Sequence, residues 1–234
     1  MAKKFIFELI DIPYLSRPTI GAIDIPSTAA RIQAIRKGGS RRNYNRVFKL
    51  VGDMTSGMAK AEAVLRSLED EPDEVWRRQL QDVCERLYAV FGKSVSRWYP
   101  VGRRPIELYE RSWFKPAIRG VWWRDGVAAA MLVNPRKTLF LDAVVRSFLA
   151  RGVIEFHLLD DPNLHEFKII DLGAAPHTGD RDTRVYSMTD VDPMELGEFE
   201  SILRRFLQAV EHAGFANQPS EGQRIVDLFK KPKK

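Results

Sequence analysis

The segment 122–135 places the strongest constraint on what this chain can fold into. Asp125-Gly126 is a pair typical of a two-residue β-turn, because both turn positions take a positive φ. The residues that follow, 127–133, form a continuous apolar run, and an Asn-Pro pair ends it. A strand of this composition is expected to be covered on both of its faces. The segment therefore predicts a β-hairpin whose second strand lies in the core.

Periodic apolar residues predict helices in other parts of the chain. The most regular pattern runs over 73–91, with acidic residues at its start and Gly92 at its end. The pattern over 41–68 contains Gly52 and Gly57, so this helix is expected to kink or to split. The remaining helices are expected at 27–37, at 137–151 with Gly152 as its cap, and at 193–213 with Gly214 as its cap.

Strands are expected in three further places. Residues 5–10 alternate in character as a first strand would, and 105–134 is rich in β-forming residues. The segment 153–172 reads as a second hairpin that turns at 160–163. The polar residues 174–192 are expected to form a loop.

Together these elements predict an α+β fold. A helical N-terminal region (27–92) is expected to pack with a mainly antiparallel sheet (105–172) and with a long C-terminal helix (193–213). One compact domain over 1–234 is the expectation. The alternative is a division into a helical region, 1–96, and an α+β region, 97–234.

Composition narrows the class of protein. With 234 residues and 44% apolar side chains, the chain can bury a substantial core. No apolar run approaches about 18 residues, so no membrane span is expected. The N-terminal apolar stretch is interrupted by Glu8 and Asp11, which argues against a signal peptide. The single cysteine, Cys84, allows neither an internal disulfide nor a cysteine-cluster zinc site, and cytoplasmic residence is expected.

The net charge of +6 is distributed unevenly along the sequence. Residues 1–50 carry ten basic and three acidic side chains, whereas residues 151–200 carry four basic and twelve acidic ones. This asymmetry predicts one basic face and one acidic face. A basic face attracts nucleic acid, anionic lipid or an acidic protein.

The segment 31–49 is basic and contains a Gly-Gly-Ser turn between two predicted helices. Backbone amides at such a turn can bind phosphate, and the arrangement resembles a helix-turn-helix element whose second helix begins near Arg41, with Asn45 among its base-reading residues. The segment could instead contact an acidic protein or an RNA surface, or it could be a solvated basic face. The candidate nucleic-acid contacts in this segment are Arg36, Lys37, Arg41, Arg42, Asn43, Arg46 and Lys49.

The segment 97–124 combines seven aromatic and seven basic residues among its 28. Aromatic faces stack on bases and guanidinium groups contact phosphates, but the same composition suits strands with tryptophans in the core and arginines in water. Successive side chains of a strand point to opposite faces, so one of Trp122 and Trp123 is expected in the core and the other is free to stack. The candidate contacts in this segment are Arg103, Arg104, Trp113, Lys115 and Trp122.

A Glu-x-Lys triplet at 166–168 follows two aspartates, and this order resembles the carboxylate and lysine signature of restriction-type nucleases. In those enzymes the acids hold Mg²⁺ and the lysine assists the attacking water. The alternative is a solvated sheet face on which opposite charges of the predicted hairpin pair across the strands. The candidate catalytic residues of the nuclease hypothesis are Asp160, Asp161, Glu166 and Lys168.

The polar stretch 176–184 contains His177, Asp180 and Asp182, which could bind a metal but are also ordinary loop residues. The chain has no nucleophile elbow, phosphate-binding P-loop or dinucleotide fingerprint. The favoured hypothesis is a nucleic-acid-binding protein, for DNA or RNA, that is not an enzyme and needs no cofactor. The first alternative is the Mg²⁺-dependent nuclease. The second is a scaffold or accessory subunit that meets a protein partner through the acidic block 155–200.

Overall fold

A computed structural model shows how these elements are arranged. It describes residues 5–16, 22–37, 44–57, 60–92, 95–101, 106–109, 112–116, 118–175, 177 and 179–215. Helices and a mainly antiparallel sheet both contribute to the core, which confirms the predicted α+β class. Among the described helices, none is both long enough and apolar enough to cross a membrane.

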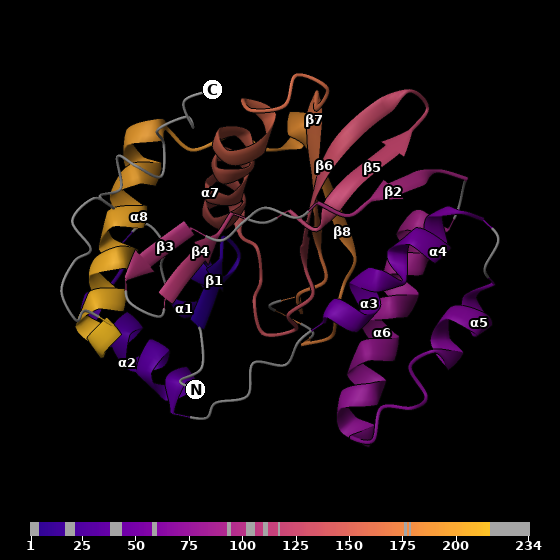
Figure 1. Cartoon of the computed structure of the whole chain (residues 1–234), viewed down its shortest axis with the longest axis horizontal. Coiled ribbons are helices and arrows are strands. Elements are labelled where there is room, and N and C mark those ends of the chain that lie inside the picture. Colours follow the sequence, from indigo (N-terminus) through magenta and orange to yellow (C-terminus); the bar gives the residue numbers. More distant parts are fainter. Residues whose placement is uncertain are drawn as a thin grey trace.

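A sheet of five strands forms the centre of the molecule (Figure 1). Its β6–β7 pair is parallel, and its other neighbouring strands are antiparallel. The predicted hairpin joins β5 to β6, and its turn residues Asp125 and Gly126 have φ of 52° and 82°. The strand order across the sheet is β2 (Arg97–Tyr99), β5 (Gly120–Arg124), β6 (Val127–Asn134), β7 (Glu166–Asp171) and β8 (Arg184–Ser187).

Strand β6 is buried on both faces, as its apolar composition predicted. Its side chains enter two hydrophobic clusters in strict alternation. Ala130 and Leu132 belong to the cluster on one side of the sheet, whereas Met131 and Val133 belong to the cluster on the other. The sheet therefore separates two cores, and a layer of other elements covers each of them.

Four helices cover one side of the sheet (Figure 1). The pattern over 41–68 is split among three of them, as predicted. The second break contains Gly57, with a φ of 69°, but the first lies at Leu50, and Gly52 is inside a helix. The longest helix begins after Asp73, whose carboxylate accepts a hydrogen bond from the backbone N–H of Trp76, and ends before Gly92. The four are α3 (Asn45–Lys49), α4 (Val51–Thr55), α5 (Ala61–Arg66) and α6 (Glu74–Phe91).

Helices and a second sheet cover the other side (Figure 1). In this small sheet the order is β1-β4-β3, with β1 parallel to β4 and β3 antiparallel to it. The layer consists of α1 (Asp11–Leu15), α2 (Ile25–Arg36), α7 (Ala143–Val153), α8 (Leu196–Val210), β1 (Phe5–Glu8), β3 (Ile106–Tyr109) and β4 (Ser112–Lys115).

The predicted hairpin over 153–172 is wrong in its first half. Helix α7 continues there through a π-helical turn, Ile154–Leu158, and only the second half forms a strand, β7. A short apolar run is compatible with either a helix or a strand, and packing in the core decides between them. Gly152 is not a cap but lies inside α7, where an added Cβ would come 2.5 Å from a methyl carbon of Leu9.

The segment 174–192 is not wholly a loop. It contains strand β8 and a 3₁₀ turn, Met188–Asp190. Strand β8 is an edge strand with mixed composition, and its pairing with β7 supplies the hydrogen bonds that hold it. The apolar periodicity on which the prediction relied is weak in such a strand.

Candidate nucleic-acid interface

Strand β5 carries two adjacent tryptophans with very different environments. Trp122 is 5% exposed, whereas Trp123 is 46% exposed. Their side chains leave opposite faces of the strand. The prediction that one of the two lies in the core is therefore confirmed.

The Trp122 side of β5 is sealed by helix α6. The Trp122 ring packs edge-on against Phe91, with 5.2 Å between the ring centroids, and its indole N–H donates a hydrogen bond of 2.8 Å to Ser96 Oγ. Trp98 on β2 packs against the same Phe91 ring at 5.5 Å. A buried ring has no free face for a base, so Trp122 is corrected from a candidate contact to a core residue.

The opposite side of the β2–β5 edge carries Arg97, Tyr99 and Trp123, which we call the open face. Arg97 is the direct partner of Trp123, and Tyr99 is the direct partner of Val121, so all these side chains leave the same face of the sheet. Tyr99 and Trp123 are each 46% exposed, and Arg97 is exposed too. Within the described part of the chain, the three side chains of the open face form no ion pair and no hydrogen bond.

The position of α7 explains why this face is open. Helix α7 packs on β7, and α8 lies beyond α7, so this layer covers the middle of the sheet (Figure 1). Strands β2 and β5 lie on the other side of β6, away from α7. Among the described elements, the sheet is thus covered on both faces at β6 and on only one face at β2 and at the outer part of β5.

The basic segment 31–49 does not gather into a site among the described residues. Lys37 and Lys49 are exposed, but Lys37 follows α2 in one layer and Lys49 ends α3 in the other. The helix expected to read bases begins only at Asn45 and has five residues. Of the other candidates, the side chain of Arg36 and the residues Arg41, Arg42, Asn43, Arg103 and Arg104 lie outside the described part of the structure.

Arg46 is occupied by an internal contact. Its guanidinium forms ion pairs with Asp70 and, at 3.1 Å, with Glu71, and donates a hydrogen bond to the carbonyl oxygen of Ser67. The hydrogen bond from Arg46, reinforced by its charge, lowers the pKa of the Asp70 carboxyl. Two carboxylates therefore balance the charge of Arg46, and its role is to fasten α3 to the turn after α5.

Trp113 and Lys115 lie on β4 of the small sheet, in a different sheet from the open face. Both are half-buried. Arg119, from the same basic and aromatic segment, has a structural role, since it pairs with both carboxylate oxygens of Glu8 at 3.2 and 2.6 Å and lies over the ring of Phe48. The structure thus separates the aromatic residues that the sequence groups together.

The candidate nuclease residues do not form a metal site in the described part of the chain. Asp161 accepts hydrogen bonds from both nitrogens of Asn163 in the turn before β7. Glu166 and Lys168 lie two residues apart on β7, where they pair with each other at 3.6 Å, and both are half-buried. Within the residues that the structure describes, no three His, Cys, Asp or Glu side chains are grouped as a metal ion would need, and this includes His177, Asp180 and Asp182.

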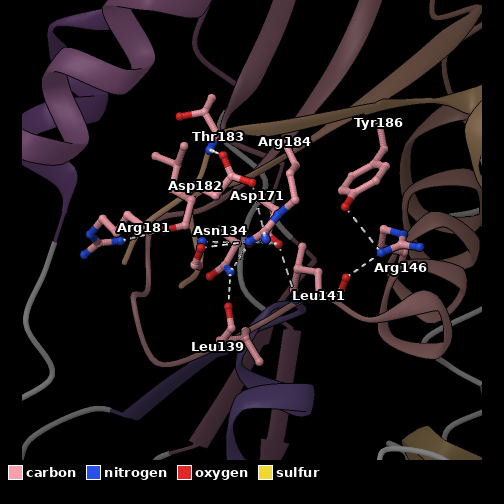
Figure 2. Close-up of polar contacts among 12 residues, drawn as sticks. Asn134, Leu139, Leu141, Arg146, Asp171, Arg181, Asp182, Thr183, Arg184 and Tyr186 are labelled. Carbon is pink, nitrogen blue, oxygen red and sulfur yellow. Dashed lines mark hydrogen bonds and ion pairs between the residues drawn. The ribbon is translucent and has the colours of Figure 1, made fainter. Parts of the chain in front are cut away.

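A buried polar network, which the sequence did not predict, lies at the carboxyl ends of the parallel strands β6 and β7 (Figure 2). Asn134 and Asp171 are fully buried, and the Asn134 amide donates to Asp171 Oδ1 and to the carbonyl oxygen of Leu139, both at 2.7 Å. The Asp171 carboxylate also accepts from two backbone amides and forms an ion pair of 3.0 Å with Arg184. Because its acceptors are all engaged, Asp171 supports the loops around it and leaves no position for a substrate.

Arg181 extends this network to the helical layer. It donates to the carbonyl oxygens of Pro135 and Leu172 and pairs with Asp82 of α6 at 2.8 Å. The available sequence signal was that polar residues, Asn134 and Asp171, end two apolar strands, since the carboxyl ends of parallel strands meet at one edge. In the structure, the residues that carry this signal hold the surrounding loops together and do not form an active site.

Comparison of the chain with protein families, with curated proteins and with solved structures finds no match. Among the described residues, the open face is the strongest candidate for a binding surface.

Proposed function

We propose that this protein binds nucleic acid through the open face of the β2–β5 edge. The observation that carries the proposal is that two exposed aromatic rings, Tyr99 and Trp123, share one face of the sheet with the guanidinium of Arg97. Among the described residues, this guanidinium has no carboxylate partner. Aromatic rings offer stacking surfaces to bases, and a free guanidinium offers bidentate hydrogen bonds to phosphate.

The environment of Arg97 distinguishes it from the other arginines near the sheet. Arg119 is paired with Glu8 and Arg124 with Asp125, at 2.6 and 3.0 Å. An arginine already paired with a carboxylate gains less from a phosphate, because it must give up its first partner. Arg97 has no such cost, and the net charge of +6 adds a general attraction for a polyanion.

The test is a salt titration of binding to fluorescently labelled DNA and RNA, followed by anisotropy. Affinity should fall steeply as salt is added, with a log–log slope of about −0.7 per phosphate contacted on a single strand and about −0.9 on a duplex. Arg97→Ala should weaken binding and make the slope shallower by about one such contact.

Arg78→Ala is the matched control. Arg78 is also an exposed arginine, but it lies on α6 and pairs with Glu74, so its removal changes the net charge equally without touching the open face. Equal losses in the two variants would show that only the overall charge matters. The absence of binding to every DNA and RNA probe would refute the proposal itself.

A further inference from the structure

The spacing of the two aromatic residues on the open face gives information about the form of the nucleic acid. Tyr99 pairs with Val121, which lies two residues before Trp123 on β5, so the rings leave the sheet from diagonal positions on adjacent strands. Diagonal neighbours of an antiparallel pair are about 7–8 Å apart. Val121, directly opposite Tyr99 and two residues before Trp123 on the same face, is half-buried and adds an apolar side chain beside the two rings.

This spacing is about twice the 3.4 Å rise per base along a strand of B-DNA. The value refers to the backbone positions from which the two rings extend. At such a spacing, two neighbouring bases that each stack on one ring are separated from each other. Inside a duplex each base has both faces covered by its neighbours, whereas an unpaired base can turn out and stack on a side chain. The open face therefore fits bases that are neither paired nor stacked in a helix.

Arg97 supplies the positive charge of the open face. It is directly opposite Trp123 on the neighbouring strand, and directly opposed residues of an antiparallel pair are about 4.5–5.5 Å apart. A guanidinium beside a stacked base can bind the phosphate attached to it. Stacking accepts any base, because each one has a π-face, so this arrangement carries little sequence preference.

We infer that the ligand of the open face is a single-stranded nucleic acid, with two successive bases on Trp123 and Tyr99 and a phosphate on Arg97. This inference rests on the proposed nucleic-acid binding and specifies the class of ligand.

The first experiment is a competition. A labelled single-stranded oligothymidine is bound to the full-length protein and displaced by unlabelled single strand or by duplex of matching length. The single strand should compete at least about ten times more effectively, because stacking on the two rings is available to it alone.

Substitutions then test the two rings. Trp123→Leu and Tyr99→Leu should each weaken single-strand binding by about 5- to 150-fold, while Trp123→Phe, which keeps a stacking face, should lose only a few-fold. Val185→Ala is the control, because Val185 is similarly exposed on the strand at the opposite edge of the sheet. Single-strand binding should also quench tryptophan fluorescence in the wild type and much less in Trp123→Phe, and circular dichroism should show that every variant is folded.

The outcomes separate the inference from the proposed function. Suppose that binding depends on salt and is weakened by Arg97→Ala, but is equally strong for duplex and unchanged by Trp123→Leu. This result would support the proposed function and overturn the inference. Binding to neither single strand nor duplex would overturn both.

Discussion

The two faces of the β2–β5 edge are built from similar residues but lie in different environments. On one face, Trp98 and Trp122 pack against Phe91 of α6 and form part of a core. On the other face, Tyr99 and Trp123 are exposed to solvent. Residues adjacent in the sequence thus differ in exposure. The layer that contains α6 extends to this edge of the sheet, whereas the layer that contains α7 does not.

The covering layer is attached to the strands directly. The backbone N–H of Ser96, just before β2, donates to the carbonyl oxygen of Thr55 at the end of α4, and the Ser96 hydroxyl accepts from Trp122. Large aromatic residues are expensive to leave in water, so the uncovered pair on the opposite face is the feature that needs a functional explanation. Three predictions about stability test whether the two faces really differ in this way.

The largest effect is expected from the tryptophan pair. Trp122→Ala should lower the free energy of unfolding by about 3–5 kcal/mol, because it removes a buried ring and leaves a cavity against Phe91. Trp123→Ala should cost clearly less, about 1 kcal/mol, because the residue is 46% exposed and loses mainly its contacts with neighbours on the sheet. Urea denaturation of the two variants measures both values. Similar losses in the two would mean that the open face is part of a core.

A smaller effect is expected at Gly120, where the absence of a side chain lets the Trp98 ring pack directly on the backbone of β5. A Cβ added there would come 2.5 Å from Cζ2 of Trp98 and 2.8 Å from the carbonyl oxygen of Tyr99. Gly120→Ala should therefore cost about 1–3 kcal/mol through overpacking.

Gly197→Ala is the control for Gly120→Ala. Gly197 lies in the first turn of α8 with no atom within 4 Å of an added Cβ, so alanine should be neutral or stabilising by up to about 1 kcal/mol. A stable Gly120→Ala variant would show that Trp98 can move away, and that the covered face is less rigid than its contacts suggest.

Features encoded by local pattern could be predicted from the sequence. The turn at Asp125-Gly126, the apolar strand after it and helix α6 each follow from residues close together in the chain. The run 153–159 could not be assigned correctly, because its apolar residues suit a helix and a strand equally, and contact with the rest of the core makes it helical.

The candidate site depends on contacts that no local pattern contains. Alternation showed that Trp122 and Trp123 point to opposite faces, but only the position of α6 decides which of them is covered. Arg46 looked like a phosphate contact until its partners appeared on a turn more than twenty residues away. That Arg97 has no carboxylate partner among the residues the structure describes is likewise a property of the folded surface, and nothing in the composition of segment 97–124 separates it from Arg119.

The smallest of the three effects concerns Cys84, which lies in the same hydrophobic cluster as Trp122. Burial, assisted by the charge of Glu85, raises the pKa of this thiol from its ordinary value of 9.0 to about 12. In the unfolded chain the thiol loses its proton near pH 9, whereas in the folded protein it keeps it. The stability linked to this group is therefore complete below about pH 9 and is lost as the pH rises towards 12.

The measurement compares the wild type with Cys84→Ala in urea denaturations from about pH 8 to about pH 10. Over this range the free energy of unfolding of the wild type should fall, relative to that of Cys84→Ala, by up to about 1 kcal/mol. The reason is that the thiol ionises only in the unfolded wild type, which this ionisation stabilises. Adding Trp123→Cys to the Cys84→Ala variant places the thiol on the open face, where its pKa should be ordinary and no such shift should occur. A difference between wild type and Cys84→Ala that stays constant with pH would mean that water reaches Cys84, and the contrast between a sealed face and an open one would fail.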